Sequence, residues 1–262
     1  MAEDTQRVFS DGTAYEQGGG RWSGAIGPIF LDWLAPPTDA RWLDIGCGTG
    51  VFTDLIVSTC SPATVVAIDP SEPQIQIARK KAIAQHVDFG VADTRELPFS
   101  DQAFDVVVSA LVINFISDRP QALGEMCRVC RPHGVIAGYV WDLAAQRGPV
   151  SLITDGLQQV GAKVPPVPGT EHSGLDGLTS LFARAKLTNI GSRTIDVTMS
   201  FADFNDFWVS QTPMNMGKRI AALSETDREK LIDWVRARLP AGPDGRITYS
   251  ARANAIKALA PA

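Results

Sequence analysis

The stretch Trp42-Leu43-Asp44-Ile45-Gly46-Cys47-Gly48-Thr49-Gly50 decides the fold of this chain. It begins as a short apolar strand, turns through glycines at alternate positions, and continues into a helical run at 51–59. Because these glycines leave no Cβ atoms on the inside of the turn, a ligand can lie directly against the backbone. The N-terminal N–H groups and positive dipole end of the helix point at that ligand. Nucleotide-derived ligands are held in this way at the carboxyl edge of an open parallel sheet.

Strand-like and helical runs alternate from residue 40 to about residue 142. The expected strands are 42–45, 65–68, 87–91, 104–109 and 135–140, and the expected helices are 26–34, 51–59, 72–85 and 121–129. The tripeptide Pro132-His133-Gly134 predicts a sharp stop between the last helix and the fifth strand. Near-continuous Val and Ile runs predict a parallel sheet covered on both faces, and right-handed crossovers make it doubly wound.

The pattern changes after Trp141. Residues 147–173 are rich in Gly and Pro, and 164–169 predict a surface loop. We expect a helix at 175–186, a strand at 192–200 and helical pieces within 202–239, one of them beginning at Ser224. The final run, 246–257, alternates in part as an edge strand does. These features predict one domain that carries an inserted helical cap.

Composition limits the possible partners. The 262 residues carry a net charge of −5 and are 45% hydrophobic, which is typical of a sizeable globular α/β domain. No Lys/Arg run is longer than Arg79-Lys80-Lys81, which argues against a nucleic-acid partner. The N-terminus has no apolar signal segment, and no stretch approaches the roughly 18 apolar residues of a membrane helix. We therefore expect a cytoplasmic protein with no membrane partner.

The cysteines do not suggest a disulfide framework in a chain of this length. They are Cys47, Cys60, Cys127 and Cys130, and the histidines are His86, His133 and His172. Cys127 and Cys130 form a CxxC pair, but a structural zinc site needs two more ligands and the histidines are scattered. We expect buried thiols and no metal.

Two cofactor families use a glycine-rich first turn. Dinucleotide folds use G-x-G-x-x-G, whose third glycine allows close packing of helix on strand. Here the spacing is Gly46-x-Gly48-x-Gly50, and Val51 occupies the dinucleotide position. Asp44 can accept hydrogen bonds from loop amides and face an ammonium group, but it would repel a pyrophosphate. The turn therefore favours a cofactor that bears an amino acid.

The string 43–50 resembles motif I of the class I S-adenosylmethionine (SAM) dependent methyltransferases. Ala67-Ile68-Asp69 and Ala92-Asp93-Thr94 follow where this family places its acids for the ribose and the adenine. The stretches 93–107 and 128–134 are similar to the ubiquinone/menaquinone-biosynthesis-like subgroup (methyltransferase domain 11), although Cys130 and His133 depart from its pattern. The resemblance covers about residues 12–142. Together with the later strands it implies an α/β fold: a Rossmann-like, doubly wound, seven-stranded sheet, mostly parallel with the last strand antiparallel, and a helical cap inserted near the C-terminus.

The resemblance implies SAM as cofactor and S-adenosylhomocysteine (SAH) as product. Asp69 would hold the ribose hydroxyls, as two carboxylate oxygens suit a vicinal diol, and Asp93 would contact the adenine amino group. The structural alternatives are a helix cap for Asp69 and a turn residue for Asp93. The other implied cofactor residues are Asp44, Gly46, Cys47, Gly48, Gly50, Pro70, Thr94, Ser109 and Ala110. Cys47 is expected as a small loop side chain and not as a nucleophile.

The N-terminal segment contains a further group of expected cofactor residues. This segment resembles the Y…RWS segment that folds over the cofactor in related methyltransferases. The resemblance implies that Arg21 pairs with the methionyl carboxylate and that Tyr15 or Trp22 closes over the cofactor as a lid. The alternative is a surface segment with one packed tryptophan. The expected division is a lid and helix at 1–35, a SAM-binding core at 40–142, cap segments at 143–190 and 201–240, and final strands at 191–200 and 246–258.

Methyl transfer from a sulfonium requires alignment more than acid–base chemistry, so the catalytic residues stay unknown. A base is needed only where the acceptor loses a proton; His172 is a candidate base, Asn114 is a candidate contact to the acceptor or lid, and His133 is expected to be structural. The expected acceptor is a small molecule that fits an aromatic, Met-rich cap. The residues of that cap are Trp141, Phe201, Phe204, Phe207, Trp208, Met214 and Met216, most of which also suit the core of the cap. Alternatives are a non-catalytic SAM-binding protein or an NAD(P)-dependent oxidoreductase. We expect the protein to be a monomer or a homodimer.

Overall fold

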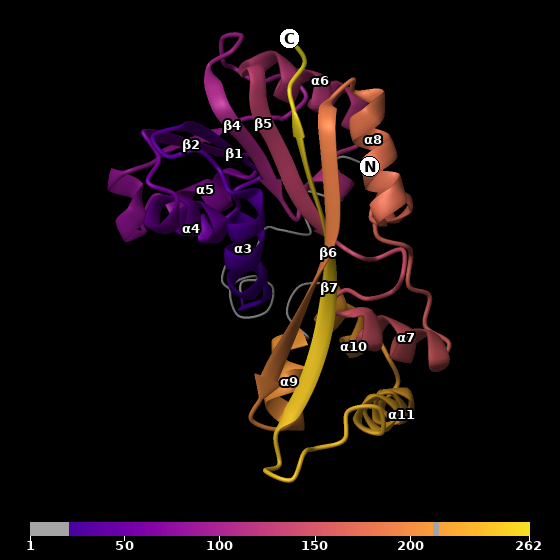
Figure 1. Ribbon diagram of the computed structural model, residues 1–262. Helices are drawn as coiled ribbons and strands as arrows, with labels where there is room; N and C mark the ends of the chain where they lie inside the picture. The colour runs from indigo at the N-terminus through magenta and orange to yellow at the C-terminus, as the bar shows by residue number, and fades with distance from the viewer. Residues whose placement is uncertain (1–20, 212–214) are drawn as a thin grey trace.

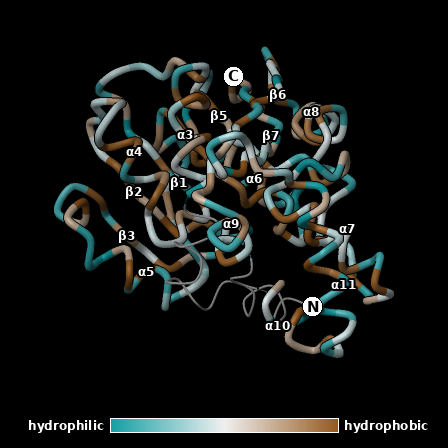
Figure 2. Tube along the Cα trace, turned by 90° about the horizontal axis from the view of Figure 1, so that it is seen from below, coloured by the Kyte–Doolittle hydropathy of each residue, from teal (hydrophilic) through white to brown (hydrophobic). Residues whose placement is uncertain are grey.

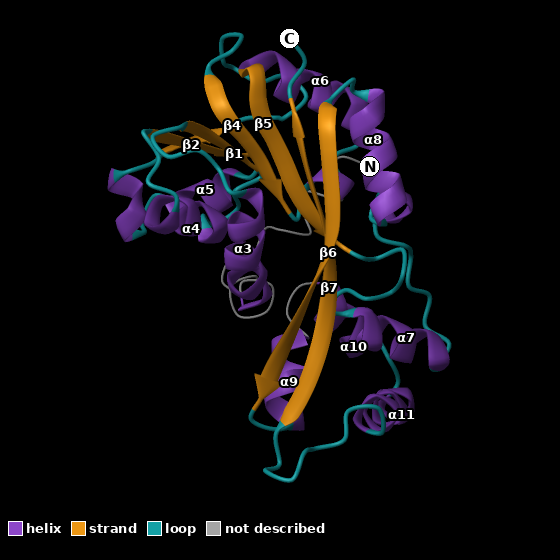
Figure 3. Ribbon diagram, viewed as in Figure 1, coloured by secondary structure: helices purple, strands orange, loops and turns teal. Residues whose placement is uncertain are grey.

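The computed structural model describes residues 21–211 and 215–262, so the predictions for Tyr15 and Met214 lie outside the described residues. The described strands form one seven-stranded sheet in the order β3-β2-β1-β4-β5-β7-β6 (Figure 3). They are β1 (Arg41–Ile45), β2 (Thr64–Asp69), β3 (Asp88–Val91), β4 (Phe104–Ala110), β5 (Cys130–Trp141), β6 (Thr188–Phe201) and β7 (Ile247–Leu259). The first five pair in parallel, and β7 is antiparallel to both β5 and β6. The predicted fold class is confirmed.

Helices cover both faces of this sheet because successive strand residues point to opposite sides. α3 (Arg21–Leu34), α4 (Val51–Thr59) and α5 (Glu72–Ala78) pack on the face to which Trp42, Val106 and Ala137 point. α6 (Arg119–Val129) and α8 (Leu175–Arg184) pack on the other face, against Leu43 and Val107 (Figure 1). Both apolar faces are therefore buried, which explains the continuous Val and Ile runs of the central strands.

The cap is built on the parts of β6 and β7 that extend past the other strands (Figure 1). Its helices are α7 (Ser151–Gln159), α9 (Phe204–Gln211), α10 (Asn215–Ala221) and α11 (Glu225–Arg236). The view from below separates α7, α10 and α11 from α4 and α5, with α9 between the two groups (Figure 2). Ile153 and Leu157 of α7 share a buried core with Leu231 and Val235 of α11. The side-chain hydroxyl of Ser224 accepts from the Asp227 N–H and caps α11, as its position predicts.

Two local predictions are wrong, and one helix was not predicted. The expected helix 72–85 ends at Ala78 and resumes as the 3-10 helix Ala82–Gln85, because the Lys80 and Lys81 N–H groups bond to carbonyls three residues back. The Gly- and Pro-rich stretch 147–173 contains the unpredicted helix α7, whose apolar residues lie four apart and pack into the cap core, and the predicted loop 164–169 contains no helix or strand. The final strand is not an edge: β7 lies between β5 and β6, and it alternates only because part of it faces the cap.

The tripeptide Pro132-His133-Gly134 lies within β5 and does not end the helix before it. α6 ends at Val129 because Cys130 is already extended and begins β5. His133 then adopts a φ of 59°, and the pairing of β4 with β5 shifts register between Phe104 and Val106. The tripeptide therefore forms an irregularity in the strand at the edge opposite the candidate site.

In the part of the chain that the structure describes, no helix combines the length and the apolar character needed to cross a bilayer.

Candidate functional site

The glycine turn joins β1 to α4 in a conformation that only glycine adopts easily. Gly46, Gly48 and Gly50 have φ values of +73°, +56° and +83°. The Gly46 and Cys47 N–H groups both donate to the Ile68 carbonyl, at 2.7 and 3.0 Å, so the turn is fixed to the end of β2. A Cβ atom at Gly46 would lie 2.5 Å from a methyl carbon of Val112, the residue that follows β4 closely. The turn is therefore held between the ends of three strands.

Asp44 is fully buried one residue before the end of β1. Its Oδ2 accepts from the Thr53 hydroxyl of α4 at 2.7 Å, and its Oδ1 has no hydrogen-bond partner among the described residues. Burial raises the pKa of this carboxyl to about 7, against the opposing effect of the Thr53 hydrogen bond and with a smaller contribution from the nearby charge of Asp69. An unpaired buried carboxylate oxygen is costly, and a cation is its natural partner.

The loop amide predicted for Asp44 is instead bound by Asp69. At the end of β2, Asp69 Oδ2 accepts from the Gly48 N–H at 3.0 Å, and Oδ1 accepts from the Ser71 N–H at 2.8 Å. Burial raises the pKa of this carboxyl, although both hydrogen bonds oppose the rise. Each oxygen keeps a second lone pair for a further donor. Asp69 thus stabilises the start of α5, whose N-cap is Ser71, and can also receive two hydroxyl groups; the exposed Pro70 lies between these residues.

Asp93 and Thr94 follow β3, on the far side of β2 from the glycine turn. Thr94 is buried, whereas the Asp93 side chain is 46% exposed and forms a salt bridge with Arg95. Hydrogen bonds from the Arg95 side chain hold the pKa of Asp93 below its ordinary value. The two predicted acids at the tips of β2 and β3 therefore lie in different environments: one buried, and one exposed and paired.

The end of β4 borders the glycine turn on the side opposite β2. Ser109 is fully buried and its Oγ has no hydrogen-bond partner within the described ranges, while Ala110 is half-buried. Leu111 adopts a φ of 62° and donates its N–H to the Tyr139 carbonyl of β5. Asn114 donates from Nδ2 to the Pro168 carbonyl at 3.3 Å. Asn114 therefore ties the loop before α8 to the site, a role that its sequence position does not reveal.

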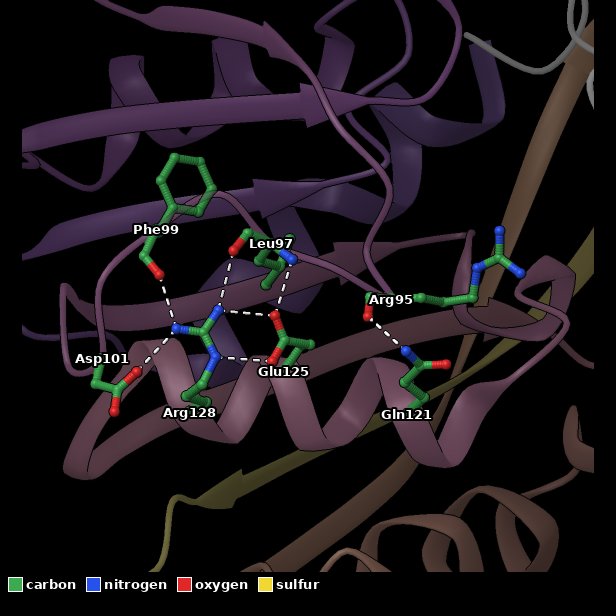
Figure 4. A network of polar contacts seen from close by, with 7 residues as sticks. All are labelled: Arg95, Leu97, Phe99, Asp101, Gln121, Glu125 and Arg128. Atoms are coloured by element: carbon green, nitrogen blue, oxygen red, sulfur yellow. Dashed lines mark hydrogen bonds and ion pairs between the residues drawn. The ribbon is translucent and has the colours of Figure 1, made fainter.

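Side chains of α6 hold the segment that follows Asp93. Gln121, Glu125 and Arg128 lie on one helical face at i, i+4 and i+7 (Figure 4). Arg128 donates to the Leu97 and Phe99 carbonyls at 2.9 and 2.7 Å, and Glu125 accepts from the Leu97 N–H at 2.8 Å. The two sequence stretches that suggested a methyltransferase subgroup, 93–107 and 128–134, are thus in direct contact.

The N-terminal predictions have mixed support. Arg21 pairs with Asp206 of α9, with 3.3 Å between Nη1 and Oδ1, and its guanidinium lies over the Phe201 ring. Trp22 is 1% exposed and meets the ring of Trp141 edge-to-face at 6.2 Å between centroids. Its burial agrees with the packed-tryptophan alternative, and its place over the cofactor stays a prediction. The pairing of Arg21 with a ligand carboxylate stays a prediction.

The histidines and cysteines of the described residues form no second site. His172 lies 3.6 Å from the exposed Glu171, and its loop is fixed by Asn114. Burial raises the pKa of the Cys47 thiol well above its ordinary value, so this thiol resists ionisation. Across residues 21–211 and 215–262, no group of three or more His, Cys, Asp or Glu side chains is placed to hold a metal ion.

Sequence reasoning missed several residues that shape the site. Thr53 hydrogen-bonds to Asp44, Val112 packs on Gly46, and Arg95 pairs with Asp93. Thr53 carries a usable signal, since it is a hydroxyl in the first turn of the helix after the glycines. The contacts of Val112 and Arg95 depend on loop conformations that have no repeating sequence pattern.

Comparison with known proteins finds similarity in the region that contains the candidate site. Residues 43–138 match a family model described as a methyltransferase domain. The malonyl-[acyl-carrier protein] O-methyltransferase of Serratia marcescens is 32% identical over 165 residues, covering 61% of this chain and 62% of that protein. The ubiquinone/menaquinone biosynthesis C-methyltransferase of Dinoroseobacter shibae is 35% identical over 109 residues, covering 40% and 44%. The chain thus spans less than two thirds of the length of these relatives.

A solved structure shows the same fold. A phosphoethanolamine N-methyltransferase of Haemonchus contortus, solved with phosphomonomethylethanolamine and SAH, superposes with a TM-score of 0.58 at 18% identity. The match covers 96% of this chain and 57% of that one.

Proposed function

We propose that this chain, whose residues 43–138 match a methyltransferase domain, transfers a methyl group from SAM to a small-molecule acceptor by in-line displacement. One observation carries this proposal. A turn with glycines at three alternate positions lies between two buried carboxylates, Asp44 and Asp69, and one oxygen of Asp44 has no partner among the described residues.

The residues present fit this cofactor. The unpaired Asp44 Oδ1 suits the positive methionyl ammonium, and the backbone at Gly46, Cys47, Gly48 and Gly50 allows close approach. Asp69 would hold the ribose hydroxyls beside Pro70. Asp93 and Thr94 would hold the adenine, and Ser109 and Ala110 would lie beside the sulfonium, as the family resemblance suggests.

When bound, SAM supplies a methyl group on a positively charged sulfur, which is already a strong electrophile. The share of the protein is to align the acceptor with that methyl group and to exclude water. Among the described polar residues at the end of β4, Asn114 is bound to the Pro168 carbonyl, so we assign it to positioning the loop before α8. No general base is assigned, since none is required unless the acceptor must lose a proton as it attacks.

The cap supports an apolar or aromatic acceptor. Phe201 and Phe207 are fully buried with ring centroids 5.2 Å apart, so they belong to the cap core. Trp141 is only half-buried at the carboxyl end of β5, beside Trp22. We therefore assign Trp141 to the acceptor pocket. The proposed division keeps 40–142 as the cofactor core, 143–190 and 201–240 as cap segments, and 191–200 and 246–258 as the final strands. Within 143–190, α8 packs on the sheet and not with the other cap helices.

Isothermal titration calorimetry with SAM, SAH and NADH tests the cofactor. We expect SAM and SAH to bind and NADH not to bind; binding of NADH alone would contradict the proposal.

Turnover of methyl-labelled SAM in a metabolite extract then separates an enzyme from a non-catalytic SAM-binding protein. We expect labelled small molecules with the wild-type chain and none with the Asp69→Ala control. SAM binding without any labelled product would favour the non-catalytic alternative.

A further inference from the structure

Arg95 grips the carboxylate of Asp93 with three donors. The Arg95 backbone N–H donates to Asp93 Oδ1 at 2.9 Å. The side-chain Nε donates to Oδ1 at 3.0 Å and is shared with Oδ2 at 3.1 Å, and Nη2 donates to Oδ2. This bidentate geometry fixes the rotation of the carboxylate, which a single hydrogen bond would leave free.

Arg95 is itself held from two further directions. Its Nη1 donates to the Ser117 hydroxyl at 3.2 Å, in the loop before α6. Its backbone carbonyl accepts from Gln121 Nε2 at 2.9 Å, as Figure 4 shows. The orientation of Asp93 is therefore set by α6 and by the loop after β4, and not by β3 alone.

The clasp leaves the carboxylate capable of one more contact. A carboxylate has about four acceptor positions, and Arg95 occupies about three of them. The Asp93 side chain is still 46% exposed, so an incoming donor can reach the remaining position. The neighbouring guanidinium also keeps Asp93 ionised, because it holds the pKa of that carboxyl below its ordinary value.

We infer that Arg95 is a positioning residue that aims the free acceptor position of Asp93 at the exocyclic amino group of adenine. This inference rests on the proposed function. An oriented carboxylate oxygen favours a purine with an exocyclic amino group facing it. It disfavours a purine with a carbonyl oxygen at the same position, because two facing hydrogen-bond acceptors repel. Arg95 thus makes the site select adenine over hypoxanthine.

The chain provides a matched control at the opposite edge of the sheet. Arg41, the first residue of β1, grips Asp105 with its backbone N–H at 2.8 Å, its Nε at 3.0 Å and its Nη2 at 3.1 Å. Both clasps use a backbone N–H, an Nε and an Nη2 of a partly exposed arginine, and Asp105 is also paired with Arg131, with 2.8 Å between Nε and Oδ1. Only the Asp93 clasp lies at the edge with the glycine turn, so only its removal should alter ligand selection.

The test compares two inert ligands by isothermal titration calorimetry. They are SAH and S-inosyl-L-homocysteine, which differ in carrying an amino group or a carbonyl oxygen on the purine. The proteins are the wild type, Arg95→Met, Arg95→Lys, Asp93→Asn, the double variant Arg95→Met/Asp93→Asn and Arg41→Met. We expect the wild type and Arg41→Met to prefer SAH by about tenfold or more, the scale of one hydrogen bond to a charged group.

Arg95→Met should lose most of this preference while still binding both ligands, and Arg95→Lys should restore only part of it, because ammonium cannot bind both oxygens in a fork. Adding Asp93→Asn to Arg95→Met should cause little further loss. An unchanged preference in Arg95→Met, or no preference in the wild type, would overturn the inference alone. Failure of the wild type to bind SAH would overturn the proposed function as well.

Discussion

Replacing Asp44 by Asn tests whether the buried charge of Asp44 destabilises the ligand-free protein. Asn has nearly the same shape and its amide oxygen can still accept from the Thr53 hydroxyl, which lies 2.7 Å from Asp44 Oδ2 in the wild type. The substitution removes the buried charge and places an uncharged amide NH2 group where Oδ1 has no partner. We therefore expect the ligand-free variant to be more stable than the wild type at high pH.

The magnitude follows from the shifted pKa. Burial raises the pKa of Asp44 from 3.8 to about 7 in the folded state. The folded protein thus binds this proton more tightly than the unfolded chain, so stability falls as the pH rises from about 4 to 7. At 1.36 kcal/mol for each pKa unit, the cost of the charged form above pH 7 is at most about 4 kcal/mol.

Urea unfolding followed by circular dichroism at several pH values between 5 and 8 measures this cost. The free energy of unfolding of Asp44→Asn should exceed that of the wild type by a few kcal/mol at pH 8, and the difference should shrink toward pH 5. Glu229→Gln, on an exposed position of α11, is the control and should change the free energy by less than about 0.5 kcal/mol.

Two results would refute this reasoning. A difference that does not vary with pH would mean that Asp44 is not protonated in this range. A less stable Asp44→Asn protein at pH 8 would mean that the charge already has a stabilising partner in the ligand-free protein. The same variant should bind SAH about tenfold or more weakly, because the ammonium loses its anionic partner.

Other substitutions test the remaining parts of the site. Asp69→Ala should weaken SAM binding by about 1.5–3 kcal/mol, as the loss of charge-assisted hydrogen bonds does, and unchanged affinity in calorimetry would remove the ribose assignment. Gly46→Ala should destabilise the fold by about 1–3 kcal/mol in thermal or urea unfolding, because the residue has a φ of +73° and its Cβ would meet Val112 at 2.5 Å; equal stability would contradict the close packing of the turn. Arg128→Met should increase amide hydrogen exchange across 95–101, since Arg128 holds the Leu97 and Phe99 carbonyls; unaltered exchange there would show that the segment is ordered without α6.

The central strands, and the three acids at or near their carboxyl ends, could be predicted from the sequence. Strand β1, helix α4 and the glycine turn appear within a residue of their predicted positions, since apolar runs and glycines at fixed spacing constrain them locally. The acids follow from position, because the carboxyl ends of parallel strands meet at one edge of the sheet. Their roles toward a ligand remain predictions.

The partners of these acids were not predictable. Which oxygen of Asp44 meets Thr53, and which acid receives the Gly48 N–H, depend on the path of the turn in three dimensions. Helix α7 was missed because glycines and prolines surround it, although Ile153 and Leu157 lie four residues apart, as on one face of a helix. The place of β7 between β5 and β6 is a property of the whole sheet and not of its own residues.

A crystal structure with SAH tests the central claim most directly. The account predicts that the homocysteine ammonium lies near Asp44, that the ligand follows the backbone from Gly46 to Gly50, and that the ribose hydroxyls meet Asp69. An SAH molecule bound away from the carboxyl edge of β1 and β2, or a turn that stays empty at saturating SAH, would contradict it.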